Sequence, residues 1–267
     1  MSIITISRGS YSHGKAIAEK VAKKLGYECI SREVLLEASD EFNISEIKLL
    51  HALRDAPSIF DRFTYGKEKY IAYIQAALLK LFQKDKVVYH GFAGHFFVKD
   101  IPHVLKVRII VDIEDRVEIV RKREGISRKE ALHFIKKLDD QRKKWSKQLY
   151  SIDTWDSSLY DLIIHIEKIT EKEAIEIICH TIIMEPFQTT AESQQAMNDL
   201  TLTAEVKAAL IALKPDIEGF AKNGVVDIKT TELESKEKEL VQNMKNIAER
   251  IPGIKDINFN VFPYIND

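Results

Sequence analysis

Cysteine, proline and glycine are scarce in this chain of 267 residues, which contains two, six and ten of them respectively. The two cysteines, Cys29 and Cys179, lie too far apart for a redox or metal-binding spacing, and the eight histidines do not cluster with them. A disulfide framework and a zinc site are therefore not expected. We expect reduced thiols in a cytoplasmic protein, without a structural metal.

Long apolar runs and a strong net charge are also missing. No segment approaches the roughly 20 apolar residues that span a bilayer, and the N-terminus has the pattern of a strand rather than of a signal peptide. The formal net charge is −1, so nucleic acid is not an expected partner, although basic residues outnumber acidic ones from 116 to 147. The content of 45% hydrophobic and 30% charged residues is that of an ordinary folded protein.

The most informative segment lies between a predicted strand over 3–6 and a predicted helix over 16–25. Gly9-Ser10-Tyr11-Ser12-His13-Gly14-Lys15 has the G-x-x-x-x-G-K spacing of a loop whose backbone N–H groups surround a phosphate. The helix that follows would direct the positive end of its dipole at the same anion. Position 16 is Ala16, where a Ser or Thr hydroxyl normally holds magnesium, which leaves catalysis open. The alternative is an ordinary strand-to-helix turn with an exposed lysine.

The loop, its helix and a second predicted strand over 27–31 form a β-α-β unit. This unit favours a parallel α/β sheet with ligands at the carboxyl ends of the strands. Two helix starts carry capping-box spacing, at Ser127 with Glu130 and at Thr170 with Glu173. Strands are predicted at 86–90, 104–111 and 162–166, and helices at 33–56, 67–84, 116–123, 127–149 and 170–184.

The composition changes after residue 184. Residues 185–197 are polar without apolar periodicity, which predicts a linker. Beyond them the pattern is compact, and Asn223-Gly224 between two apolar stretches predicts a hairpin. The expected elements are a helix over 200–213, strands over 217–221 and 225–230, a helix over 234–250 and a strand over 254–262. We therefore expect two domains, at 1–184 and 198–267.

Residues 1–184 resemble the cytidylate kinase-like family, within the P-loop nucleoside monophosphate kinases. The resemblance rests on the order and spacing of Ile4-Thr5-Ile6-Ser7-Arg8, Leu25-Gly26-Tyr27, Gly91, Pro102-His103-Val104-Leu105, Val107-Arg108-Ile109, Asp139-x-x-Arg142, Trp155-Asp156 and Leu159-Tyr160-Asp161-Leu162. It implies an α/β fold with a P-loop kinase parallel sheet and flanking helices. It also implies ATP and Mg²⁺ as cofactors and a nucleotide substrate such as CMP.

Residues 198–267 resemble a BON domain, a small α/β module. The matching segments are Thr203-Ala204-Glu205-Val206-Lys207-Ala208-Ala209-Leu210, Asn223-Gly224-Val225-Val226-Asp227-Ile228 and Ile251-Pro252-Gly253-Ile254-Lys255-Asp256-Ile257. The resemblance implies a phospholipid or protein surface as partner. An accessory domain that packs or dimerises, giving a homo-oligomer, fits about as well.

The resemblance, together with the chemistry of phosphoryl transfer, assigns roles to single residues. The loop from Gly9 to Ala16 would bind the phosphate chain, and Lys15 would neutralise its outer charges. Arg121, Arg123 and Arg142 are candidates for a lid over the phosphates, with Asp139 either orienting Arg142 or forming a structural salt bridge. Binding of the acceptor nucleotide is assigned to Arg8, Arg32, Arg54, Arg62 and Gly91. Alternatively, Arg8 only closes the edge of the sheet, and Arg32, Arg54 and Arg62 are ordinary surface charges.

Two hypotheses about function follow. The first is an ATP-dependent nucleoside monophosphate kinase acting on CMP or a related nucleotide, which Lys15 and the lid arginines favour. The second is a catalytically degenerate nucleotide-binding sensor that signals through the C-terminal domain. Ala16 favours the sensor, as does Phe92, which follows Gly91 where the family usually has an arginine.

Overall fold

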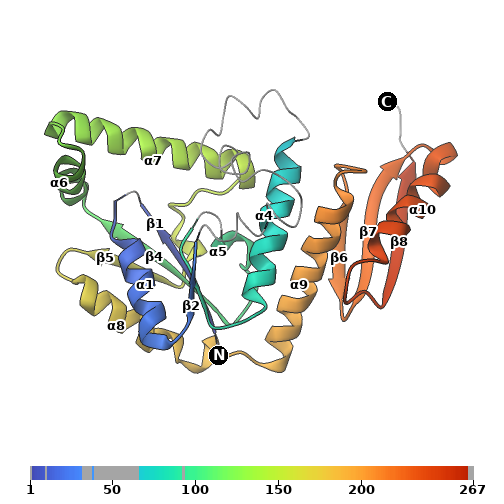
Figure 1. Ribbon diagram of the computed structural model, residues 1–267, viewed down its shortest axis with the longest axis horizontal. Helices are drawn as coiled ribbons and strands as arrows, with labels where there is room; N and C mark the ends of the chain where they lie inside the picture. The colour runs from blue at the N-terminus through green and yellow to red at the C-terminus, as the bar shows by residue number, and fades with distance from the viewer. Residues whose placement is uncertain (1, 10, 32–37, 39–65, 92–93, 264–267) are drawn as a thin grey trace. The chain divides into compact units, whose positions relative to one another are not determined.

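The computed structural model describes residues 2–9, 11–31, 38, 66–91 and 94–263 (Figure 1). These residues form two compact units, which are described separately. Among the described residues, the first unit takes those up to 31, 84–91 and 94–190, and the second takes residue 38, 66–83 and 191–263. The helix predicted over 33–56 falls almost entirely outside the described residues.

A five-stranded parallel sheet forms the centre of the first unit, in the order β2-β3-β1-β4-β5. Its strands are β1 (Ile3–Arg8), β2 (Glu28–Ile30), β3 (Val87–Tyr89), β4 (Val104–Val111) and β5 (Leu162–Ile166). Parallel strands that are covered on both faces read as nearly continuous apolar runs, which is why the sequence revealed them. The predicted α/β class is confirmed.

Helices flank this sheet (Figure 1). They are α1 (Gly14–Leu25), α5 (Gly94–Phe97), α6 (Ile113–Glu124), α7 (Arg128–Tyr150) and α8 (Glu171–Ile182), with short 3-10 turns η2 (Ser157–Leu159) and η3 (Glu185–Phe187). Both predicted capping boxes are present, so α7 and α8 begin where the sequence placed them. No helix in the described ranges combines the length and the apolarity needed to cross a bilayer.

Side-chain alternation along β1 gives its two faces different chemistry. Ile4 and Ile6 are buried in the core that α1 and α8 cover. Ser7 therefore points to the opposite face, and Arg108 of β4, its partner in register, points the same way. The polar residues at the carboxyl ends of β1 and β4 thus lie on the face away from α1.

The second unit contains a small mixed sheet in the order β6-β7-β8. Asn223 and Gly224 have φ of 54° and 85°, as a tight hairpin between β6 and β7 requires, which confirms the predicted turn. The elements of this unit are α4 (Gly66–Phe82), α9 (Ala191–Leu210), β6 (Glu218–Lys222), β7 (Val225–Glu232), η4 (Glu234–Lys236), α10 (Glu237–Ala248) and β8 (Asp256–Pro263).

The segment predicted as a linker is largely structured. Residues 185–187 form η3, and 191–197 are the first turns of α9, which begins well before the predicted helix at 200. Tertiary packing explains the early start of this helix, because α9 packs along α4. Gln83 donates to Asn198 at 3.1 Å, and Lys80 pairs with Glu205 at 3.3 Å. Because the partner helix is far away in sequence, the local pattern of 191–197 gave no sign of it.

Candidate functional site

The predicted phosphate loop connects β1 to α1. Tyr11 and His13 adopt left-handed backbone conformations, with φ of 56° and 59°. Non-glycine residues rarely do so, but backbone turns that surround anions use this region. Neighbouring contacts hold the loop in place: Ser12 is buried and donates to the carbonyl oxygen of Gly9 at 2.8 Å, and His13 Nδ1 lies 2.7 Å from Glu171 of α8.

Arg8 reaches the loop because residue 14 is a glycine. A Cβ on Gly14 would lie 2.5 Å from Cδ and 2.8 Å from Cβ of Arg8, so a larger residue would displace that side chain. Burial lowers the pKa of Arg8 below its usual range. A guanidinium held in these surroundings gains stability from a nearby anion.

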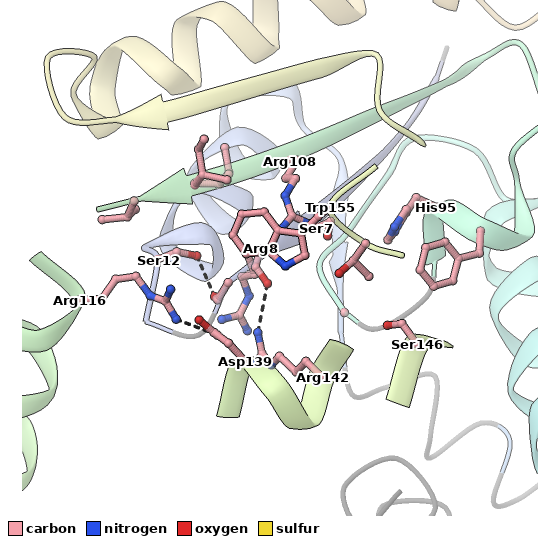
Figure 2. Close-up of a pocket in the computed structure, with 17 residues that line it drawn as sticks. Ser7, Arg8, Ser12, His95, Arg108, Arg116, Asp139, Arg142, Ser146 and Trp155 are labelled. Atoms are coloured by element: carbon pink, nitrogen blue, oxygen red, sulfur yellow. Dashed lines mark hydrogen bonds and ion pairs between the residues drawn. The ribbon is translucent and has the colours of Figure 1, made fainter. Parts of the chain in front are cut away.

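A cavity of about 110 Å³ opens beside the loop (Figure 2). The loop, the carboxyl end of β4, α5, α7 and residues 154–155 enclose it. Among the described residues that line it, four are arginines and one is a carboxylate: Arg8, Arg108, Arg116, Arg142 and Asp139. This excess of positive charge suits a polyanionic ligand.

Three of these side chains connect α6 and α7 to the loop. Arg116 of α6 donates to the carboxylate of Asp139 on α7 at 2.8 Å, and Arg142 donates to the backbone oxygen of Arg8 at 3.1 Å (Figure 2). The pKa of Arg142 is lowered to about 10, mainly by burial and also by the charge of Arg8, while Asp139 opposes the shift. Asp139 therefore pairs with Arg116, and its charge also acts on Arg142.

The other predicted site residues divide into three groups. Gly9, Ser12 and Gly91 line the cavity. Lys15, Arg121 and Arg123 are exposed outside it: Lys15 Nζ lies 3.6 Å from Glu19, Arg121 pairs with Glu118, and Arg123 pairs with Glu124 and lies over the ring of Tyr11. Ser10, Arg32, Arg54, Arg62 and Phe92 fall outside the described residues.

Sequence reasoning missed the part of the cavity around Arg108. Its guanidinium donates to the hydroxyl of Tyr160 at 2.9 Å and lies 4.9 Å from the ring centre of Trp155. The Tyr160 hydroxyl donates to the carbonyl of Thr154 at 2.9 Å and lies 3.3 Å from His95 Nε2. The available signal was Arg108 within the mainly apolar strand β4, because charged residues are rarely buried without a partner.

The residues present fit nucleotide phosphates better than they fit a magnesium ion. Ala16 has no hydroxyl, and Asp139, the carboxylate among the described cavity residues, is paired with Arg116. Elsewhere in the described part of the first unit, ligand atoms of Asp112, His165 and Glu167 lie within 4.8 Å of one another, a spacing that suits a divalent cation. These three residues do not line the arginine cavity.

Comparison with known proteins identifies the family. The sequence profile of the cytidylate kinase-like family matches residues 3–168, which is more than half of the chain. The chain belongs to the cytidylate kinase-like family. The cytidylate kinase of Archaeoglobus fulgidus is 30% identical over 181 residues, which cover 66% of this chain and 91% of that protein.

Other relatives match over shorter lengths. The cytidylate kinase of Methanopyrus kandleri is 36% identical over 74 residues, which cover 28% of this chain and 38% of that protein. The chain thus spans less than half the length of this curated relative. A crystal structure of an uncharacterized protein from Eubacterium ventriosum is similar with a TM-score of 0.53 and 25% identity, over 68% of this chain and 97% of that one. The five-stranded parallel sheet with flanking helices is the P-loop kinase fold that the resemblance implied.

Proposed function

We propose that this chain transfers the terminal phosphoryl group of ATP to a nucleoside monophosphate of the CMP or dCMP type. The observation that carries the proposal is the convergence of Arg8, Arg116 and Arg142 on the loop after β1, in a member of the cytidylate kinase-like family. Phosphoryl transfer depends mainly on positioning and on neutralising negative charge. In this proposal the loop positions the phosphates, and the clustered arginines neutralise their negative charge.

The roles that we propose for single residues combine the family resemblance with the positions of the side chains. Backbone N–H groups between Gly9 and Gly14 bind the phosphate chain of ATP, and Lys15 leaves Glu19 to contact the outer phosphates. Arg116 and Arg142 stabilise the charge that spreads over the transferred group. Arg121 and Arg123 contribute if α6 and α7 move towards the loop. When bound, Mg²⁺ adds further neutralisation, and here the nucleotide's own oxygens and water would hold it, because Ala16 offers no hydroxyl.

A second candidate is a nucleotide-binding sensor without turnover. Two observations favour it: Ala16 stands where a magnesium-binding hydroxyl is expected, and Lys15 is not among the residues that line the cavity and lies 3.6 Å from Glu19. In this version the arginines bind the nucleotide, but the transferred phosphoryl group lacks the positioning that catalysis requires.

For the C-terminal part we propose a BON-like module over 198–267 that binds a phospholipid or protein surface, with a kinase domain over 1–184. The order of elements in the module, helix, strand, strand, helix and strand, supports this assignment. Co-sedimentation of the full chain with anionic and zwitterionic vesicles tests the lipid partner. Absence of binding to both vesicle types would leave a protein surface as the proposed partner.

The kinase proposal is tested by an assay of ADP release with each nucleoside monophosphate in the presence of magnesium. Turnover that depends on one monophosphate and is abolished in Lys15→Ala supports the kinase. Saturable binding of ATP without turnover on any acceptor supports the sensor. Absence of both would contradict the two hypotheses together.

A further inference from the structure

Arg108 is a buried cation whose charge no carboxylate compensates among the described residues. Its side chain belongs to a residue that is only 7% exposed, and its partners are the Tyr160 hydroxyl and the rings of Tyr160 and Trp155. Burying an unpaired charge is costly, and a tyrosine hydroxyl with two aromatic faces offsets part of that cost. The side chain lines the cavity, so an anion that enters can complete the compensation.

Arg108 is separate from the arginines that serve the loop. Arg142 bonds to the backbone at Arg8, and the guanidinium carbon of Arg116 lies 3.6 Å from where a Cβ of Gly9 would be. Arg108 instead contacts Trp155 (Figure 2). It also contacts Tyr160, and both aromatic residues precede β5 in the chain. The cavity therefore has two cationic regions, one at the loop and one at Arg108.

His95 next to Arg108 adds no competing positive charge. Burial, together with the charges of Arg108 and Lys106, lowers the pKa of His95 to about 3. At neutral pH its imidazole is neutral and contacts the Tyr160 hydroxyl at 3.3 Å. The region around Arg108 thus combines one fixed cation with neutral hydrogen-bonding groups.

We propose that Arg108 binds the phosphate of the acceptor nucleoside monophosphate, while the loop binds the phosphate chain of ATP. This inference rests on the proposed function, because a transfer between two phosphorylated substrates needs a cationic region for each. It names a residue for acceptor binding that the sequence analysis did not assign. Trp155, which is 61% exposed and stacks on Arg108, is the residue that an incoming phosphate would disturb.

The fluorescence of Trp155 can report the binding of a ligand next to Arg108. The chain contains two tryptophans, so Trp145→Phe leaves Trp155 as the sole indole reporter. We would titrate this variant with CMP, cytidine and a non-hydrolysable ATP analogue, and follow Trp155 fluorescence together with calorimetry. Arg108→Met is then introduced into the same background, with Arg250→Met, an exposed arginine of the second unit, as the matched control.

Arg108→Met should raise the Kd for CMP by at least about tenfold, the effect of losing one charge-assisted hydrogen bond. The Kd for the ATP analogue should stay within about twofold, and the preference for CMP over cytidine should largely disappear. Arg250→Met should change none of these values. Unchanged CMP binding in Arg108→Met would overturn the inference, as would a loss of affinity confined to the ATP analogue.

Two further results keep this inference distinct from the proposed function. If the parent variant binds CMP through Arg108 but shows no turnover, the kinase proposal fails and the binding role of Arg108 stands. If the parent variant binds no monophosphate, the inference itself is wrong. If Arg108→Met does not fold, the test uses Arg108→Lys, which keeps the positive charge but loses the planar guanidinium. We then expect a smaller rise in the Kd for CMP and an unchanged Kd for the ATP analogue.

Discussion

Arg116 and Asp139 join α6 to α7 through a hydrogen bond of 2.8 Å beside the phosphate loop. Arg116 is almost completely buried, and Asp139 is partly buried. Arg142, on the same helix as Asp139, donates to the backbone oxygen of Arg8 at 3.1 Å. One ion pair thus fixes the relative position of two helices and of two cations that face the same cavity.

Asp139→Asn should destabilise the first unit, because a neutral amide replaces the charged acceptor of a buried guanidinium. We expect the free energy of unfolding to fall by about 1–3 kcal/mol. Urea denaturation measures this free energy of unfolding. Asp140→Asn, at the neighbouring exposed residue, is the control. Equal stability of the two variants would show that the pair contributes little.

Lys15→Ala should slow turnover strongly with little effect on stability. The Lys15 side chain is exposed and its contact is with Glu19 at 3.6 Å, so the fold loses little when it is removed. If Lys15 neutralises the phosphates, the rate falls by about 10²-fold or more. A steady-state assay and thermal unfolding measure the two effects. A rate that survives the substitution would contradict the role of Lys15.

Gly14→Ala should weaken nucleotide binding by displacing Arg8. The added methyl group would lie 2.5 Å from Cδ of Arg8, so that side chain must leave its position beside the loop. We expect the Kd for ATP to rise by about tenfold. Calorimetry checks this, with Gly219→Ala as control, since a Cβ there approaches no atom closer than 3.8 Å.

Buried His95 should make the stability of the first unit fall as the pH decreases below about 6.5. The pKa of His95 is lowered to about 3, whereas an unfolded histidine titrates near 6.5. Between these values the unfolded chain binds the additional proton, so acid favours unfolding. His95 alone should contribute a loss of about 2 kcal/mol between pH 7 and pH 5. Denaturation at both pH values tests this, and His95→Gln should reduce the difference.

The packing of α4 on α9 predicts that the two helices unfold together. Thr201 is fully buried, and its hydroxyl donates to the backbone oxygen of Met197 at 2.8 Å and also lies 3.4 Å from that of Leu79 in α4. Thr201→Ala removes both contacts and should lower the stability of this helix pair by about 1 kcal/mol. Hydrogen exchange should become faster in both helices. Thr181→Ala in α8 removes a similar side-chain-to-backbone bond and should affect the first unit alone. Unchanged exchange in α4 would contradict a shared unit.

The sequence was sufficient wherever the signal is local. The glycine spacing of the loop, the left-handed Gly26 that ends α1, the capping boxes and the Asn223-Gly224 hairpin all depend on residues within a few positions of each other. Steric and hydrogen-bonding rules act at that range, so the elements lie close to their predicted bounds. The parallel sheet followed from the alternation of these elements.

Long-range contacts were not accessible in the same way. Nothing near Asp139 in the sequence shows that its partner is Arg116, and nothing near residue 191 reveals that α4 covers it. Arg108 was noticed as part of a motif, yet its position at the cavity becomes visible only when β4 is aligned with β1. The roles assigned to Lys15, Arg121 and Arg123 stay predictions.

The pairing of α4 with α9 also bears on how the protein is made. Leu79 and Thr201 are 122 residues apart, and the whole of the parallel sheet beyond β2 is synthesised between them. At roughly 5–20 residues per second, α4 leaves the ribosome about 6–24 s before its partner helix exists. During that interval α9 cannot yet bury the face of α4 that it later covers, so folding of the second unit has to wait for the last third of the chain.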